Sequence, residues 1–530
     1  MKKQAYNPFL PLGVCIPDGE PHVFGDRVYL YGSHDKEGGH TFCMLDYEVF
    51  SAPVDDLSDW RSEGISYRAS QDPAYPRRKY MYAPDVVQGN DGRYYLYYCM
   101  SGDYGEGGYT EPISVAVSDN PAGPYEYLGH VRNKDGSDMM RYVCFDPSVL
   151  NDGGVIRLCY GTQYDFEERD DFATNEVYVN IEMNMFGRTK EEILSYPDSI
   201  MGPITCTLED DMLTVKEEPH HIIPYRVKGT SFEHHRFFEA SSLRKVGDKY
   251  YFVYSSMQNH ELCYAISDRP DGGFTFGGTI VSNGDVGYMG RSEENKTNMT
   301  GTTHGSIECI GGEWYVFFHR LTHKSDYSRQ ACAEKIVIKP DGSIDQVEYT
   351  SCGLNGGPLR GEGTYPAPIA CMLTNGNMPH GCNSIFKLSF PNVTNIGEER
   401  FIAEISEGTL IGYKYFDLTG VREIGVVARM ETEDNLPKFD CPVRMDERSE
   451  ESLKSKRTIL KPGEPTKEPV IEIRLTETGD AIAYIKPDES LSDTWKEISV
   501  SIPKADGVHG LYFIYHGIHN IQIKDIIFKK

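Results

Sequence analysis

The chain has few tryptophans and few basic residues for its length. Its 530 residues include only 3 Trp, and 53 Lys and Arg stand against 80 Asp and Glu, which gives a net charge of −27. This acidic balance argues against nucleic acid as a partner, because a phosphate backbone requires a basic surface. It argues equally against an anionic membrane surface. The simplest use of the negative charge is solubility.

Long apolar runs and paired cysteines are also missing. The N-terminal sequence MKKQAYNPFLPLGVCIPDG lacks an apolar core of signal-peptide length, and no segment predicts a transmembrane helix. The 13 cysteines are scattered singly without a CxxC pair. This pattern argues against a zinc site and is typical of reduced thiols. We therefore expect a cytoplasmic protein.

What the chain does contain is a five-fold repeat of a turn glycine followed by an aromatic-rich strand. The segments are GDRVYLYG (25–32), DGRYYLYY (91–98), GGVIRLCYG (153–161), GDKYYFVYS (247–255) and GGEWYVFFH (311–319). Five such strand–turn–strand units predict a five-bladed β-propeller over residues 1–365.

An acidic residue or a histidine precedes each turn glycine by seven or eight positions. These residues are Asp18, Asp85, Asp146, Glu239 and His304. The inner strand of every blade lines the central channel, so residues at one position on five inner strands should face the same axis. Carboxylates repel each other at close range, so such a cluster favours a catalytic role. The alternative is that each residue serves its own turn, and the one-residue slip between repeats supports it.

The rest of the chain has a different character. The longest interval between turn glycines contains an insertion around 162–230 with one expected helix, TKEEILSY (189–196), N-capped by Thr189. Residues 361–381 read as a connector rich in Pro, Gly and Asn. Residues 382–530 alternate in short runs that predict an antiparallel β-sandwich, with the charged stretch 431–457 as a solvated loop. The expected fold is all-β: a five-bladed propeller followed by a sandwich.

Carboxyl groups on one channel suit the hydrolysis of glycosidic bonds. One protonated group donates to the leaving oxygen, while an ionised one activates water or attacks directly. The acid needs a raised pKa, which a third carboxylate nearby can supply. The sequence alone leaves open whether the reaction inverts or retains the anomeric configuration.

The chain resembles glycoside hydrolase family 43. The matching segments are IPDGEPHVFGDRVYLYGSHD (16–35), YAPDVV (82–87), FDPSVL (145–150), FFEASSLRKVGDKYYFVYSS (237–256) and THGSIECIGGEWYVFFHR (303–320). The resemblance implies an inverting hydrolase that releases arabinofuranosyl or xylosyl residues from plant-derived oligosaccharides. It also implies Asp18 as general base, Glu239 as general acid and Asp146 as the residue that tunes the acid.

The resemblance has further implications for the site. It implies that Asp85 binds the sugar and that His304 helps to hold a calcium ion or another cation on the propeller axis. Calcium prefers oxygen ligands, so a channel histidine bonded to a carboxylate is the alternative for His304. No cofactor is required for the chemistry itself. Arg329 is a further candidate for substrate binding, and its alternative is a surface arginine.

The C-terminal part resembles a family 6 carbohydrate-binding module through NVTNIGEERFIAEISEGTLIGYKYFDL (392–418) and the ending GLYFIYHGIHNIQIKDIIFKK. Such modules bind sugar on aromatic faces, but this part has a single tryptophan, Trp495. A packing module braced against the propeller is the alternative.

Three other functions remain open for the whole chain. A glycoside phosphorylase needs a cationic phosphate cradle where Asp18 stands. A retaining fructan-type hydrolase usually has an NDPNG-like turn, whereas this chain has IPDGEP. The third is a sugar-binding propeller without catalysis.

Overall fold

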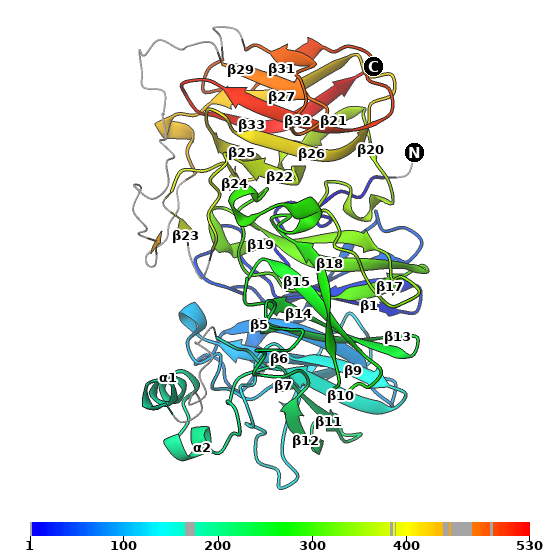
Figure 1. The fold of residues 1–530 in the computed structure, drawn as a ribbon, viewed down its shortest axis with the longest axis vertical. Coiled ribbons are helices and arrows are strands. Elements are labelled where there is room, and N and C mark those ends of the chain that lie inside the picture. The colour runs from blue at the N-terminus through cyan, green and yellow to red at the C-terminus, as the bar shows by residue number, and fades with distance from the viewer. Residues whose placement is uncertain are drawn as a thin grey trace.

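The computed structural model describes residues 3–164, 175–381, 385–386, 388–437, 445–446, 469–487 and 491–530. Five of its sheets follow one another along the chain and two more lie beyond them, so that an all-β propeller and sandwich stack end to end (Figure 1). The expected fold class is confirmed. Within the described residues, no helix is long and apolar enough to cross a membrane.

Each of the first four propeller blades is a sheet of four consecutive strands, and the fifth adds two short strands from later in the chain. Blade 1 contains β1 (Glu20–Phe24), β2 (Arg27–Tyr31), β3 (Tyr47–Pro53) and β4 (Arg61–Tyr67). Blade 2 contains β5 (Tyr80–Gln88), β6 (Tyr94–Ser101), β7 (Ser114–Ser118) and β8 (Glu126–His130). Blade 3 contains β9 (Ser148–Asp152), β10 (Val155–Tyr160), β11 (Ile204–Leu208) and β12 (Val215–His221). Blade 4 contains β13 (Phe237–Val246), β14 (Lys249–Ser256), β15 (Glu261–Ser267) and β16 (Thr275–Ser282). Blade 5 contains β17 (Ile307–Ile310), β18 (Glu313–Thr322), β19 (Ser325–Ile336), β23 (Ile385–Phe386) and β28 (Met445–Asp446).

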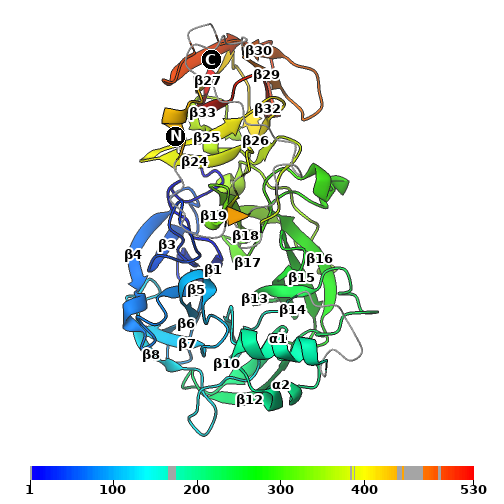
Figure 2. The same ribbon diagram turned by 90° about the vertical axis from the view of Figure 1, so that its left-hand side faces the viewer.

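The first strand of each blade is the innermost. β1 contacts both β17 and β5, and β9 contacts both β5 and β13, so these strands surround one axis (Figure 2). The second strands carry the aromatic repeat because blades pack face to face and bury both sides of each sheet. Tyr97, Tyr98 and Tyr254 are fully buried in these layers between blades.

Within the part of the chain that the structure describes, two six-stranded sheets form the sandwich. One contains β20 (Leu359–Arg360), β22 (Met372–Thr374), β26 (Leu410–Asp417), β29 (Val470–Arg474), β30 (Ala483–Ile485) and β32 (Val508–His516). The other contains β21 (Gly363–Pro366), β24 (Asn392–Ile396), β25 (Glu399–Ile405), β27 (Glu423–Met430), β31 (Lys496–Ser501) and β33 (Ile521–Lys529). Their facing sides share one apolar core that includes Ile411, Phe513 and Ile526.

The segment predicted as a connector takes part in the sandwich. β20 and β22 pair with β26, and β21 pairs with β33. Residues 359–374 therefore belong to the sandwich sheets, although the division predicted from sequence placed the propeller at 1–365 and the sandwich at 382–530. Those boundaries stay a prediction. Most of the predicted solvated loop 431–457 lies outside the described residues.

In its described residues, the insertion contains two α-helices, α1 (Glu176–Phe186) and α2 (Lys190–Leu194). The predicted helix is confirmed as α2, where Thr189 and Glu192 exchange hydrogen bonds in a capping box. The helix α1 was missed; Asn175 caps its start, and Gly187 ends it in a left-handed conformation.

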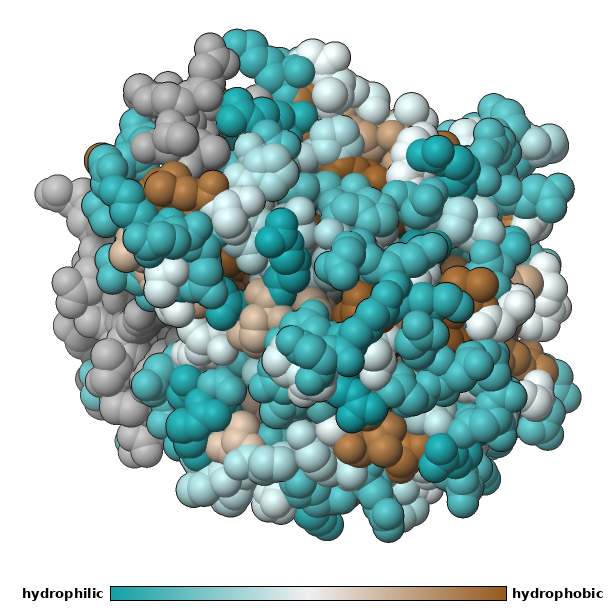
Figure 3. Space-filling model, turned by 90° about the horizontal axis from the view of Figure 1, so that it is seen from below, coloured by the Kyte–Doolittle hydropathy of each residue, from teal (hydrophilic) through white to brown (hydrophobic). Residues whose placement is uncertain are grey.

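Figure 3 views the propeller from the end opposite the sandwich and shows a mainly hydrophilic surface with separate apolar areas.

Candidate active site

A cavity of about 670 Å³ lies on the propeller where the inner strands begin. A cavity of this size suits a small ligand such as a short sugar. The predicted residues Asp18, Asp146, Glu239, His304 and Arg329 all line it. Much of the remaining wall is aromatic, with Phe42, Tyr82, Tyr109, Phe145, Tyr164, Phe238 and Tyr327. The structure thus brings together every predicted site residue except Asp85.

Unusual backbone geometry directs the acidic side chains into the cavity. Asp18 (φ 58°) and Asp146 (φ 44°) precede β1 and β9 in the left-handed region, and Ala240 (φ 67°) follows Glu239 at a bulge in β13. Non-glycine residues rarely adopt this conformation, which costs on the order of 1–3 kcal/mol and is typical of functional sites. Glu239 precedes its turn glycine by eight residues, whereas Asp18 precedes its own by seven. The bulge in β13 accommodates this extra residue, so Glu239 still reaches the position equivalent to that of Asp18.

The site residues occupy equivalent positions when residues are counted back from the last pair before each hairpin turn. Asp18, Asp146 and His304 stand six residues before the last paired residue of their inner strands, Phe24, Asp152 and Ile310. Glu239 stands seven before Val246, but its partner Ser255 is six after Lys249 because of the bulge. The turns of these four hairpins have two residues and begin with a glycine at positive φ, as tight hairpins require.

Asp85 breaks this rule because its hairpin turn is longer. The turn joining β5 and β6 spans 89–93, so Asp85 stands only three residues before the last pair, Gln88 with Tyr94. It is 0% exposed and does not line the cavity. This corrects the predicted sugar contact of Asp85. Blade 2 presents Tyr82 and Ala83 to the cavity instead.

The buried Asp85 has a structural environment of its own. Its carboxylate accepts hydrogen bonds from His22 Nε2 (2.6 Å) and from the backbone N–H groups of Val86 (2.8 Å) and Val149 (2.7 Å). It therefore ties the inner strands of blades 1, 2 and 3 together. Burial alone would raise its pKa, but His22 and the hydrogen bonds outweigh burial and hold the pKa below the usual value.

Asp18 is held as an ionised carboxylate by buried cations. Arg329 is only 4% exposed, which excludes the surface arginine considered above. Its Nη1 donates a hydrogen bond to Asp18 Oδ1 (2.7 Å). Its Nε and Nη2 donate to Oδ2 and Oδ1 of Asp35, at 2.8 and 3.0 Å. Burial alone would raise the pKa of Asp18, but Arg329 and then His304 outweigh burial and lower it.

Glu239 has the opposite electrostatic environment. Burial, followed by the negative charge of Asp146, raises the pKa of Glu239 to about 8. The hydroxyl of Thr302 donates to Glu239 Oε1 (3.2 Å). The carboxyl group of Glu239 therefore keeps its proton at neutral pH, while Asp18 in the same cavity is ionised.

His304 stands beside Asp146 and supplies a positive charge. Its Nδ1 lies 3.5 Å from Asp146 Oδ2, and the backbone N–H of Ala240 donates to the same oxygen (3.3 Å). Burial disfavours the imidazolium, but Asp146 and then Asp18 outweigh burial and raise the pKa of His304 to about 9. Burial raises the pKa of Asp146, and the contact with His304 opposes that shift.

His304 lies between two carboxylates on the propeller axis. Its second nitrogen, Nε2, faces Glu20 Oε1 at 3.9 Å, so both ring nitrogens face carboxylates. Arg244 pairs with the other oxygen of Glu20 and supplies the positive charge there. Glu20, His22 and Asp85 place three donor atoms near one another, but His22 is already bound to Asp85. The cation expected at His304 stays a prediction.

Several contributors to the site were missed by sequence reasoning. His319 Nδ1 lies 3.5 Å from Asp18 Oδ1, and its Nε2 donates to the carbonyl of Thr302 (2.7 Å). His319 and Asp35 both lie within segments that carry the resemblance, near the ends of second strands. That position was the available signal, because the second strand runs antiparallel to the first and ends beside its start.

A propeller that keeps one ionised and one protonated carboxyl group in a single cavity has the equipment of a glycosidase. The chain belongs to the glycosyl hydrolases family 43, whose sequence profile matches residues 7–344. It is therefore a glycoside hydrolase.

Some relatives match nearly the whole chain, and others match only a part of it. It is 40% identical to a xylosidase/arabinosidase of Thermoclostridium stercorarium over 99% of this chain and 98% of that one. It is 30% identical to xylosidase/arabinosidase 43A of Humicola insolens over 62% of this chain and 96% of that one. A solved structure of a family 43 enzyme from Xanthomonas citri with xylose covers 65% of this chain and 93% of that one, at 24% identity and a TM-score of 0.49.

Proposed function

We propose that the protein is an inverting glycosidase that releases xylosyl or arabinofuranosyl residues from plant-derived oligosaccharides. The observation that carries the proposal is the contrast between an ionised Asp18 and a protonated Glu239 in one cavity. The choice of sugars follows the names of the relatives, xylosidase/arabinosidase.

Each proton in this reaction has a defined donor and acceptor. Glu239 gives its proton to the glycosidic oxygen while the bond from that oxygen to the anomeric carbon breaks. Asp18 takes a proton from a water molecule whose oxygen forms the new bond on the opposite face of the sugar. The enzyme is left with Glu239 ionised and Asp18 protonated, and exchange with solvent restores both. The two carboxyl groups of an inverting pair stand about 6.5–9.5 Å apart to admit this water.

The competing functions have less support. A phosphorylase needs cationic groups for phosphate, but Arg329 is the one arginine or lysine among the described residues of the cavity wall. Arg329 already binds Asp18 and Asp35. A propeller that only binds sugar would have no use for a carboxyl group with its pKa raised to about 8.

A panel of nitrophenyl glycosides tests the proposed function. The wild-type enzyme should hydrolyse the β-D-xyloside, the α-L-arabinofuranoside or both, and Glu239→Ala should hydrolyse neither at a comparable rate. NMR of the first product should show the anomer opposite to that of the substrate. A wild-type enzyme inactive on both pentosides, or a retained configuration, would contradict the proposal.

We propose a packing role for the sandwich, rather than the sugar binding that its resemblance to a family 6 module implies. The Arg429 guanidinium lies 4.0 Å from the centre of the Trp495 ring, and Trp495 Nε1 donates to Glu399 (3.0 Å). A covered tryptophan face is unsuited to stacking on sugar.

The cytoplasmic location also stays a proposal. The cysteines that the structure describes are all free and mostly buried, as expected in a reducing compartment. The proposed partner is an oligosaccharide, with no nucleic acid and no membrane.

The pH profile of Asp146→Asn tests the tuning role of Asp146. The negative charge of Asp146 adds to burial in raising the pKa of Glu239 to about 8. Loss of protonated Glu239 produces the basic limb of kcat/KM, so removal of this charge should move the limb to lower pH and slow the reaction. Asp72→Asn is the matched control, because Asp72 is buried but bonds Tyr98 and Ser114 in blade 2. An unshifted limb with a normal rate would remove Asp146 from the catalytic set.

We expect a chelator to leave the activity unchanged, because Arg244 supplies the positive charge beside Glu20. Arg244→Met should lower the free energy of unfolding by about 3–5 kcal/mol, since it leaves Glu20 buried without its partner. Thermal unfolding and kcat, each with EDTA and with added calcium, measure both effects. Loss of wild-type activity in EDTA that calcium restores would overturn this expectation.

A further inference from the structure

One residue in the cavity wall comes from the segment that follows a sandwich strand. His380 lines the cavity, yet it lies in the segment 375–381 that leaves the sandwich strand β22. Its Nδ1 forms a hydrogen bond with the hydroxyl of Thr300 (3.0 Å). The backbone of the segment follows the propeller closely, because Thr300 N–H donates to Pro379 O (3.2 Å) and Gly381 N–H donates to Thr300 O (2.6 Å).

The close approach of this segment to the propeller requires a glycine in each of the two, Gly381 in the segment and Gly301 in the propeller. A Cβ atom at Gly381 would lie 2.2 Å from Asp326 Oδ1, and one at Gly301 would lie 2.5 Å from the same oxygen. Asp326 also lines the cavity. Side chains at positions 381 and 301 would therefore push His380 and its neighbours away from the site.

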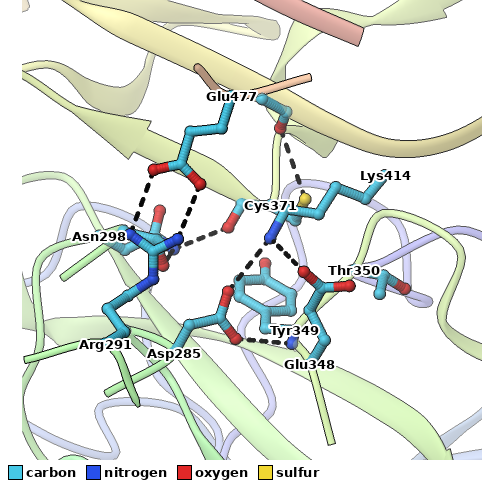
Figure 4. A network of polar contacts seen from close by, with 12 residues as sticks. Asp285, Arg291, Asn298, Glu348, Tyr349, Thr350, Cys371, Lys414 and Glu477 are labelled. Carbon is cyan, nitrogen blue, oxygen red and sulfur yellow. Dashed lines mark hydrogen bonds and ion pairs between the residues drawn. The ribbon is translucent and has the colours of Figure 1, made fainter. Parts of the chain in front are cut away.

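The segment contacted by His380 also carries the partners of the catalytic acid. Residues 297–304 include Thr302, which donates to Glu239, and His304, which faces Asp146. A sandwich strand is bound to the start of this segment, since Leu373 N–H donates to Thr297 O (2.8 Å). The side chain of Asn298 donates to the carbonyl of Cys371 (2.8 Å; Figure 4).

Buried charges fix the sandwich to the propeller beside this segment. Lys414 of β26 is 2% exposed, and its Nζ contacts Asp285 Oδ2 (3.2 Å) and Glu348 Oε1 (2.9 Å; Figure 4). Arg291 of the propeller forms a fork with Glu477 of the sandwich at 2.8 and 3.3 Å. The pair of Lys414 with Asp285 is buried and therefore costly to break on one side, so it holds the two parts in one arrangement. The fork of Arg291 with Glu477 is partly exposed and adds a second link.

We propose that His380 is a specificity-determining residue that binds a hydroxyl group of the substrate, and that Lys414 is a positioning residue that keeps it there. This inference rests on the proposed function, because it assigns a sugar to the same cavity. An imidazole in a largely aromatic wall offers a polar contact that distinguishes sugars by the direction of a hydroxyl group. The sandwich then acts on the reaction by holding one wall of the propeller cavity.

Steady-state kinetics of His380→Ala on the aryl β-D-xyloside and α-L-arabinofuranoside test the first part. Loss of one hydrogen bond to the sugar should raise KM about tenfold for one substrate and change the ratio of the two kcat/KM values by a similar factor. The basic limb near pH 8 should stay in place, because Glu239 is untouched. His509→Ala is the control, since His509 is a partly exposed sandwich histidine outside the cavity wall, and its Nε2 lies 3.2 Å from the carbonyl oxygen of Asp506.

Lys414→Met tests the second part. It should change the ratio of the two kcat/KM values in the same direction as His380→Ala, and the double variant should change it no further, because both act through one contact. Lys529→Met, which removes a surface lysine of the sandwich, should leave the ratio unchanged. If Lys414→Met does not fold, Arg291→Met breaks the neighbouring fork with Glu477 and takes its place.

The outcomes separate this inference from the proposed function. A wild-type enzyme that hydrolyses neither pentoside removes the proposed function and this inference with it. An active wild type whose KM and substrate ratio are unchanged by His380→Ala overturns the inference alone. If Lys414→Met lowers only the melting temperature and leaves the ratio unchanged, the sandwich is a stabilising module without influence on the site.

Discussion

Asp18→Asn should lower kcat by about 10³–10⁴-fold on every glycoside, whether the leaving group is activated or not. An amide at this position cannot accept a proton from water, and attack by water is required for all substrates. The variant should still fold, because Asp35 keeps two hydrogen bonds to Arg329 when the charge of Asp18 is lost. Initial rates on an aryl glycoside and on a natural oligosaccharide, with circular dichroism as a check on folding, measure the effect.

A small anionic nucleophile sharpens this test. Azide carries its own charge and needs no base, so it should restore turnover of an activated aryl glycoside by Asp18→Asn and give a glycosyl azide of inverted configuration. Asp26→Asn is the control, because Asp26 lies in the exposed turn of the same hairpin. An Asp18→Asn enzyme that keeps a tenth of the wild-type rate without azide would exclude Asp18 as the base.

Much of the fold could be predicted because the repeat depends on residues that are neighbours in the sequence. A glycine at positive φ closes a tight hairpin, and an aromatic strand after it is buried between blades. Because four hairpins share a two-residue turn, counting back from the glycine found Asp18, Asp146, Glu239 and His304, which line one cavity. The same count failed for Asp85, because the length of its turn depends on strand pairing that sequence spacing does not reveal.

The rest of the site depends on contacts between distant parts of the chain. Arg329 meets Asp18 and Asp35 across about 300 residues of sequence, and no local pattern distinguishes it from a surface arginine. His380 lies in a segment rich in Pro, Gly and Asn, which read as a connector. Its place in the cavity follows from the pairing of β22 with β26 and from the contact with Thr300. Such contacts become visible only when the sheets are assembled.

Glu239→Gln should separate substrates by their leaving groups. On natural oligosaccharides, whose leaving alcohols need a proton, we expect kcat to fall by about 10³–10⁴-fold. On dinitrophenyl glycosides, whose leaving groups depart without protonation, the loss should be about tenfold or less. The basic limb of kcat/KM should also disappear, because glutamine does not titrate and the wild-type limb reflects Glu239, whose pKa is about 8. The acid limb should remain, since it belongs to Asp18.

A second buried glutamate provides the control for this assignment. Burial raises the pKa of Glu182 to about 7, and its carboxyl group bonds Ser199 beneath α1 without lining the cavity. Glu182 is therefore a second carboxyl group that can ionise near the range of the basic limb. Glu182→Gln should keep the limb and the leaving-group dependence of the wild type, because it leaves Glu239 in place. If Glu182→Gln abolishes the limb while Glu239→Gln keeps it, or if Glu239→Gln slows all leaving groups equally, Glu239 is not the acid that protonates the glycosidic oxygen.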